Sequence, residues 1–375
     1  MKLKVLAFGA LALAFGALSM VTGAYSAGRP VCLVSNERTG IGARSLQEAI
    51  DAANPGDTLV VKGTCVGFST IDKNLTLKGV RNEPFGEPTL DGSGTTGVLA
   101  IAGCCTSLEV AVDNLTITRS GGDGICLCGF ADHTLTLSRT TVSDNAGIAV
   151  TGIAGTVTLI DSTVRGNGDG LFAGRTGWTL VRSRVLDNRG VGIGVSRGFA
   201  SLTDSTVSNN GRGISGSQGS LEISGSIVSD NHGPGITLFS DAGLSLVNST
   251  VSGNTTSGSG GGIHAFEQAV AVLVDATITG NTAGLDGGGI SIGPLSSFTV
   301  TNSTVTGNTA SRNGGGIYIT GDLDGSGNLT LADSTVSGNT ATSGGGIFND
   351  GITTLVGTNT IINNTPNDCV GVAGC

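Results

Sequence analysis

The side chains that could do chemistry fall in one column of the sequence, one position after a recurring glycine-isoleucine pair. Its main polar and aromatic members are His264, Ser291, Tyr318 and Phe348. A histidine next to a hydroxyl group could transfer a proton, and Glu267 and Asp286 on nearby segments could assist it. The simpler interpretation is a mixed polar and aromatic surface that holds a sugar by stacking.

The whole column lacks a carboxylate, since its members are Cys126, Ala149, Phe172, Gly194, Ser215, Thr237, His264, Ser291, Tyr318 and Phe348. Cleavage of a glycosidic bond normally requires two carboxyl groups flanking that bond. We therefore assign no catalytic residue, and expect the four residues from His264 to Phe348 to line a ligand-binding surface. His232 lies in a predicted turn, and we expect it to be a solvated loop residue.

One acidic segment resembles a calcium-binding loop, with oxygen ligands at Asp322, Asp324, Ser326 and Asn328. The glutamate that usually closes such a loop is absent, because the twelfth position holds Asp333. An ordinary turn rich in aspartate and glycine would explain the same residues. We therefore assign no metal and no other cofactor, and keep calcium at this loop as a candidate.

The first 26 residues have the pattern of a secretory signal peptide: Lys2 and Lys4, an apolar run, and a small-residue cleavage site at Ala24-Tyr25-Ser26. A membrane anchor is the alternative, although glycine and serine interrupt the apolar run. No second segment is long enough to span a bilayer. We expect a mature chain of residues 27–375, secreted or on the cell surface, with no membrane insertion.

Eight cysteines in an exported chain favour disulfides. We expect one bridge between Cys32 and Cys65 and one between Cys369 and Cys375. We also expect two bridges among the other four cysteines, which lie about one coil apart and could pair between adjacent coils: Cys104, Cys105, Cys126 and Cys128. Zinc bound by these four is the alternative.

Charge is distributed unevenly along the chain. The formal net charge is −9, and Arg312 is the only basic residue between Gly213 and Cys375. A phosphate backbone is bound by clustered lysines and arginines. The sequence therefore predicts no nucleic-acid partner, and a polysaccharide or a cell-surface protein remains as the expected partner.

An asparagine recurs along most of the chain, at first every 21 to 23 residues, at Asn145, Asn167, Asn188, Asn210, Asn231, Asn254, Asn281, Asn308, Asn339 and Asn364. A period in this range is typical of a solenoid, in which each repeat buries its apolar side against its neighbours. Three residues before each asparagine stands a valine or isoleucine, which must point inward. We expect the asparagine amides to stack and to satisfy buried turn groups.

Each repeat predicts three short strands joined by three bends, so about twelve coils would form three parallel sheets in an all-β fold. Aspartate, asparagine and glycine are common at the bend before the valine column, as expected for left-handed backbone. Ser45 to Glu48 is a capping box that predicts a short helix, which would cap the first coil within residues 32–65. Residues 366–375 are expected to cap the last coil.

Two stretches resemble a known family. Residues 45–65, SLQEAIDAANPGDTLVVKGTC, resemble the helical cap and first coil of secreted bacterial right-handed parallel β-helix proteins of the pectate-lyase-like superfamily. Gly338-Asn339-Thr340-Ala341, followed by Gly344-Gly345-Gly346-Ile347, is similar to repeats of polymorphic outer-membrane proteins and related adhesins. The resemblance implies a single-stranded right-handed β-helix, a fold that carries lyases, hydrolases, epimerases and adhesins.

The aspartate and arginine sets that such enzymes use for catalysis or calcium binding have no recognisable match in this chain. We therefore expect a non-catalytic structural, adhesive or glycan- or protein-binding role. The alternative is an extracellular lyase or hydrolase acting on uronic-acid-rich polymers. The later repeats also have longer loops after the asparagine, at 255–262, 282–289, 309–316 and 340–346, which would form a ledge beside the rod. These loops are a candidate binding region, or merely glycine-rich extensions.

Overall fold

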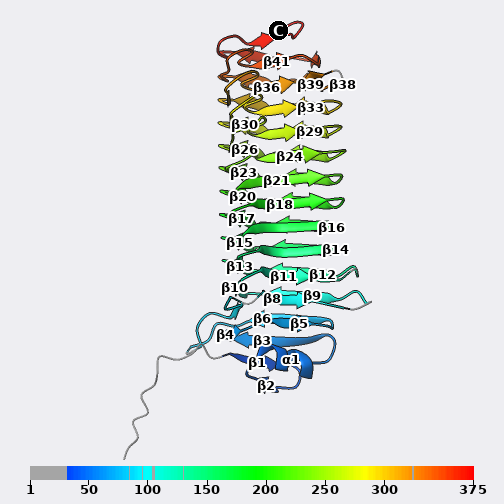
Figure 1. Cartoon of the computed structure of the whole chain (residues 1–375), viewed down its shortest axis with the longest axis vertical. Coiled ribbons are helices and arrows are strands. Elements are labelled where there is room, and N and C mark those ends of the chain that lie inside the picture. The colour runs from blue at the N-terminus through cyan, green and yellow to red at the C-terminus, as the bar shows by residue number, and fades with distance from the viewer. Residues whose placement is uncertain (1–31, 84, 95, 104–105, 130, 323–324) are drawn as a thin grey trace, which may run out of the picture.

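A computed structural model describes residues 32–375, except residues 84, 95, 104–105, 130 and 323–324. The chain winds into a column of stacked coils, with the N-terminal strands at one end and the C-terminus at the other (Figure 1). The all-β parallel solenoid predicted from the repeat is thereby confirmed. The predicted signal peptide, residues 1–26, lies outside the described residues.

Three parallel ladders run along the column. The first ladder is a 13-stranded sheet made of β4 (Thr64–Val66), β7 (Thr89–Asp91), β10 (Thr116–Thr118), β13 (Thr141–Ser143), β15 (Thr163–Arg165), β17 (Arg184–Leu186), β20 (Thr206–Ser208), β23 (Ile227–Ser229), β26 (Thr250–Ser252), β30 (Thr277–Thr279), β34 (Thr304–Thr306), β40 (Thr335–Ser337) and β43 (Thr360–Ile362).

The second ladder contains β5 (Ser69–Ile71), β8 (Gly97–Ile101), β11 (Asp123–Leu127), β14 (Ile148–Ile160), β16 (Asp169–Val181), β18 (Val191–Ser196), β21 (Arg212–Ser217), β24 (Ile236–Phe239), β28 (Ile263–Ala265), β32 (Ile290–Ile292), β36 (Ile317–Ile319), β41 (Ile347–Asn349) and β44 (Cys369–Val370).

The third ladder contains β3 (Asp57–Lys62), β6 (Leu75–Gly79), β9 (Glu109–Asp113), β12 (Thr134–Ser138), β14, β16, β19 (Phe199–Thr203), β22 (Ser220–Ser224), β25 (Gly243–Val247), β29 (Val270–Val274), β33 (Ser297–Thr301), β39 (Asn328–Ala332) and β42 (Ile352–Val356). The long strands β14 and β16 belong to both the second and the third ladder, so these two ladders join into one continuous sheet.

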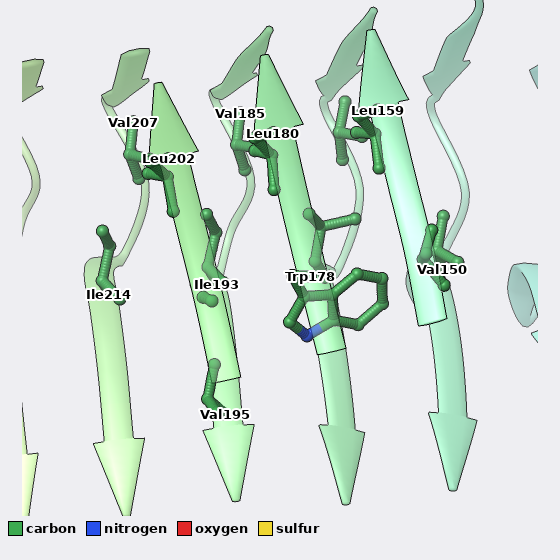
Figure 2. Close-up of a cluster of buried hydrophobic side chains, with 14 of the residues drawn as sticks. Val150, Leu159, Trp178, Leu180, Val185, Ile193, Val195, Leu202, Val207 and Ile214 are labelled. Carbon is green, nitrogen blue, oxygen red and sulfur yellow. The ribbon is translucent and has the colours of Figure 1, made fainter. Parts of the chain in front are cut away.

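The interior is filled mainly by aliphatic side chains from the strands of the three ladders. The valine and isoleucine column of the first ladder is fully buried from Val142 to Val336, whereas Ile361 in the last coil is only partly covered. Figure 2 shows this core at β14, β16 and β18, where the buried Trp178 lies among the side chains of neighbouring strands. The column therefore buries its apolar side between coils, as a solenoid must.

The asparagines form a continuous hydrogen-bonded ladder. The Oδ1 atom of Asn210 accepts from the backbone N–H of Asn188 at 3.1 Å and from its amide at 2.9 Å. The Asn210 amide in turn donates to Oδ1 of Asn231 at 3.1 Å and to the carbonyls of Val185 and Ser208. The Asn-to-Asn bonds recur from Asn145 to Asn364. Each buried amide thus satisfies backbone groups of its own and the preceding coil.

A second ladder, made of hydroxyl groups, lies at the other end of most first-ladder strands from β13 to β40. The N–H of Ser183 donates to Oγ of Ser205, and the N–H of Ser205 donates to Oγ of Ser226. This hydroxyl ladder was not predicted from the sequence. Its signal is a serine or threonine two residues before most of the inward valines, for example Ser205 before Val207.

The left-handed bend is expected three residues before each of the ten inward valines and isoleucines from Val142 to Ile361. It is present at nine of these positions, which are Arg139, Asp161, Arg182, Asp204, Gly225, Asn248, Asp275, Asn302 and Asp333. The tenth prediction, Thr358, is wrong because Gly357 takes the positive φ of 66° in the last coil. The residue before each ladder asparagine is also left-handed, for example Asn209 at φ 54° and Gly253 at φ 65°. Aspartate, asparagine and glycine tolerate this backbone best.

The ledge loops add a fourth, smaller parallel sheet to the three predicted ones. It consists of β27 (Thr255–Thr256), β31 (Thr282–Ala283) and β35 (Thr309–Ala310), and an isolated bridge extends it to Thr340. Glycines allow these loops to stack closely: a Cβ atom on Gly288 would lie 2.4 Å from the carbonyl oxygen of Gly315. The ledge is therefore an ordered surface rather than a set of independent loops.

The predicted helix is α1 (Leu46–Ala52), and Oγ of Ser45 accepts from the N–H of Glu48 at 3.2 Å. Its apolar side is buried beside β1 (Leu33–Asn36), which pairs antiparallel with both β2 (Gly42–Ala43) and β3. These elements lie at the N-terminal end of the column (Figure 1). At the other end β44 continues only the second ladder. Capping of the two ends by residues 32–65 and 366–375 stays a prediction.

Disulfides join Cys32 to Cys65 and Cys369 to Cys375 in the structure. A third disulfide joins Cys126 to Cys128 at the end of β11, so it lies within one coil. One of the two bridges expected among the four central cysteines is thus present, but it does not join adjacent coils as considered from the sequence. Cys126 and Cys128 are only two residues apart in the sequence, so their sulfur atoms can bond within the same coil. Cys104 and Cys105 lie outside the described residues.

Replacing Asn210 by leucine tests the asparagine ladder. Leucine has a similar size, but the N–H of Asn188 and the carbonyl of Val185 would lose their buried partners, at about 1–3 kcal/mol for each group. We expect the free energy of unfolding, measured by urea denaturation, to fall by roughly 2–4 kcal/mol. The matched control is Asn349→Leu, because the one hydrogen bond of that side chain, to the carbonyl of Gly371, lies outside the ladder. If both variants lose the same free energy of unfolding, Asn210 is not part of a buried ladder.

Candidate functional site

The four predicted binding residues lie on one outward column of the second ladder. His264 of β28 pairs in register with Ser291 of β32, and Ser291 pairs with Tyr318 of β36. Tyr318 pairs in turn with Phe348 of β41. Residues that are far apart in the sequence therefore become direct neighbours on successive coils.

The predicted column is wrong at Ala149. The outward residue of this coil is Thr151, which pairs with Cys126 and Phe172, while Ala149 is buried. In the other coils the isoleucine of the pair points inward, as Ile125 does. In this coil the pair is Gly147-Ile148, and the inward position opposite Ile125 is taken by Val150, two residues later. The pair is thus not a reliable marker of register where β14 is extended.

An aromatic cluster lies beside His264. The rings of Phe239 and Phe266 stack with centroids 4.6 Å apart and planes 13° apart, and the imidazole of His264 lies 4.1 Å from the Phe266 ring. The sequence analysis missed both phenylalanines. Their signal was the alternation of the strands, since Thr237 and Phe239, like His264 and Phe266, are two residues apart and share one face.

A groove of about 380 Å³ lies between the second ladder and the ledge. From the ladder side it is lined by Thr237, Phe239, His264 and Phe266. From the ledge side it is lined by the segment 256–259, whose side chains are hydroxyl groups or hydrogen. Arg212, His232, Gly211, Gly233 and Pro234 complete the lining at one end. Among these residues there is no carboxylate.

A smaller hollow of about 190 Å³ adjoins the groove and shares Ser259, His264 and Phe266 with it. Ser291 and Tyr318 line this second hollow. The Tyr318 ring lies 5.8 Å from the ring of Phe348, which lines neither space. Together the groove and the hollow, here called the aromatic groove, extend over several coils.

The pKa values of His264 and Tyr318 in the aromatic groove are both shifted by burial. Burial lowers the pKa of His264 from 6.5 to about 4, because the protonated ring loses its hydration. Burial also raises the pKa of Tyr318. His264 and Ser291 are side by side on adjacent strands, and no hydrogen bond joins these two side chains in the structure.

Asp286, considered as an assisting carboxylate, is occupied by structural contacts. It is buried, its Oδ2 atom accepts from Arg312 at 2.7 Å, and its Oδ1 atom accepts from the N–H and amide of Asn313. Glu267 is exposed next to Phe266. The carboxylate of Asp286 therefore holds the ledge in place instead of acting on a ligand.

Asp324 of the calcium candidate lies outside the described residues. The segment forms a two-stranded antiparallel hairpin, β37 (Gly321–Asp322) with β38 (Gly325–Ser326), followed by Asn328 in β39. Within the part of the chain that the structure describes, no three histidine, cysteine, aspartate or glutamate residues are grouped to hold a metal ion. Calcium at this hairpin stays a prediction. No helix among the described residues is long and apolar enough to cross a membrane.

The pKa of His264 yields a prediction about pH. Because the folded pKa of about 4 lies below the ordinary 6.5, protons bind the unfolded chain more readily. The contribution of His264 to stability is therefore complete above pH 6.5 and is lost as the pH falls towards 4. In an NMR titration we expect a midpoint near pH 4 for His264, and a shift towards 6.5 in Phe266→Ala, which admits water. His264→Gln assigns the resonance, and a midpoint near 6.5 in the unaltered protein would contradict the burial.

Comparison with known proteins agrees with this architecture. The family described as the right-handed β-helix region matches residues 96–255 and 216–374. Among solved structures, the A-module of mannuronan C-5 epimerase AlgE6 from Azotobacter vinelandii has a TM-score of 0.53 and 16% identity, and the alignment covers 87% of this chain and 93% of that one. No curated protein sequence matches this chain.

Two further solved structures are less similar. The A-module of mannuronan C-5 epimerase AlgE4 from Azotobacter vinelandii gives a TM-score of 0.49 at 17% identity, covering 88% of this chain and 95% of that one. A double mutant of the periplasmic alginate epimerase AlgG gives 0.44 at 13% identity, covering 81% and 85%. Identities this low show a shared fold alone. The stacked parallel coils and the match over most of its length establish that the chain belongs to the right-handed β-helix family.

Proposed function

We propose that this protein is a secreted or cell-surface binding protein that holds a polysaccharide chain in the aromatic groove without cleaving it. The observation that carries the proposal is the stacked pair Phe239 and Phe266 beside His264, facing the hydroxyl-bearing ledge segment 256–259 across the groove. Aromatic faces pack against the C–H faces of sugar rings, while hydroxyl groups exchange hydrogen bonds with them.

Binding rather than cleavage is favoured by the chemistry of the groove. Hydrolysis of a glycosidic bond needs paired carboxyl groups, and the described lining of the aromatic groove contains none. A neutral imidazole that is not hydrogen-bonded to its neighbouring hydroxyl supplies no activated nucleophile. The disulfides are consistent with an oxidising, extracytoplasmic location.

The second candidate is an enzyme acting on uronic-acid-rich polymers. It is supported by the name of the AlgE6 module, a mannuronan epimerase with the same fold. Purified protein incubated with alginate and polygalacturonate, with and without calcium, would distinguish the two. Reproducible shortening or epimerisation of either polymer would show that the protein is an enzyme and contradict the proposal of a non-catalytic binding protein.

Removing one aromatic ring tests the binding proposal. We expect Phe266→Ala to weaken binding of a soluble polysaccharide roughly tenfold, since a stacked ring contributes about 1–1.5 kcal/mol. Isothermal titration against a panel of neutral and acidic glycans would measure this loss. Phe199→Ala is the matched control, because Phe199 is similarly exposed but lies on the third ladder. Glycan binding with equal affinity in both variants would show that the ligand lies elsewhere.

A further inference from the structure

Positive charge borders one end of the aromatic groove. Arg212 and His232 line the groove itself, and an open hollow of about 520 Å³ next to it is lined by His232 and Arg189. The two spaces share Gly211 and His232, so they adjoin. The side chains of Arg189, Arg212 and His232 are all exposed. A polymer lying along the aromatic rings would therefore meet Arg212 first and Arg189 next.

These guanidinium groups are not neutralised within the described chain. No described carboxylate lies within ion-pairing distance of Arg189 or Arg212, whereas Arg312 is bound to Asp286. Asp187 also lines the open hollow, and it is the one acidic residue described there. Residues 163–212 contain seven arginines and three aspartates, although the chain as a whole has a net charge of −9. The local field at this end therefore favours anions.

The coils hold these side chains in place. Arg212 lies over the backbone of Gly233, where an added Cβ atom would come within 2.8 Å of its Cγ atom. The N–H of His232 donates to the carbonyl of Asn210, the ladder asparagine, at 2.9 Å. Arg189 follows ladder residue Asn188 directly and reaches the carbonyl of Ala146 at 3.4 Å. The asparagine ladder thus fixes the spacing between the cations and the aromatic rings.

We propose that Arg189, Arg212 and His232 form a subsite for the acidic groups, carboxylate or sulfate, of a polysaccharide whose sugar rings occupy the aromatic groove. This inference rests on the proposed function, because the same polymer occupies both parts. Arginine suits the role, since its planar fork donates paired hydrogen bonds to either acid group. The acidic coils after Gly213 oppose a polyanion elsewhere on the rod, so its binding is confined to this end of the groove.

Dextran, carboxymethyl dextran and dextran sulfate of equal length test the subsite, because they share one backbone and differ in their acid groups. We expect the unaltered protein to bind a charged polymer more tightly than dextran, with an affinity that falls as salt rises. The double variant Arg189→Gln with Arg212→Gln should lose roughly two- to fivefold per arginine for the charged polymer. Its affinity for dextran should not change. Tighter binding of one charged polymer identifies carboxylate or sulfate as the preferred group.

Arg197→Gln is the matched control, because Arg197 is an exposed arginine that is bonded to Gln218 and lines neither the groove nor the open hollow. The inference is overturned if charge on the dextran brings no gain, if none of the three polymers binds, or if the control loses as much affinity as the double variant. Phe266→Ala separates the two proposals. If the double arginine variant loses affinity for the charged polymer but Phe266→Ala does not, the protein has an anion site and the aromatic groove does not bind the polymer.

Discussion

The ladder of buried asparagine amides sets the height of each coil on the one before it. Each Oδ1 atom accepts two hydrogen bonds from the preceding asparagine, one from its backbone and one from its amide. Water cannot replace these partners, because the amides are almost completely buried. A shift of one coil by a single residue would break the bonds on both sides of it. The ladder therefore fixes how the side chains on the outer surface of successive coils line up.

This constraint also explains why coils of different length coexist. Successive ladder asparagines are 23, 27 and 31 residues apart at different places, yet the bond between them is the same. The extra residues lie in the ledge and in the hairpin β37–β38, outside the register of the three main ladders. Insertions can thus build a groove wall without moving the aromatic rings that form its floor. In this chain the groove is present where the ledge begins.

The fold could be predicted from the sequence because the residues that define the repeat, a valine or isoleucine and an asparagine in each coil, are buried. The inward valines and the asparagines admit few substitutes, so the coil order and the column from His264 to Phe348 followed from alignment alone. The register failed at Ala149, where a surface pair of residues imitated the repeat. Phe239 and Phe266 were missed because outward positions vary freely between coils. The Cys126–Cys128 bond depends on local backbone path, which periodicity does not specify.

The site illustrates how a repetitive scaffold supports a local function. The coil interior repeats, while the stacked rings of Phe239 and Phe266, the imidazole of His264 and the guanidinium groups of Arg189 and Arg212 come together on a few neighbouring coils. Glycan binding in this account requires no catalytic group. It requires that three side chains from three different coils keep their spacing along the axis, which the interior ladder supplies. A coil that slipped would separate Arg212 from the stacked rings.

The most direct test is a double-mutant cycle across two adjacent amides, measured as the free energy of urea unfolding of Asn210→Leu, Asn231→Leu and the double variant. If the two side chains share hydrogen-bonded partners, the double variant should lose less than the sum of the single losses, with a coupling of about 0.5–3 kcal/mol. The pair Asn210→Leu with Asn308→Leu, several coils apart, should show additive losses. Additive losses for the adjacent pair as well would contradict a continuous ladder and the register that depends on it.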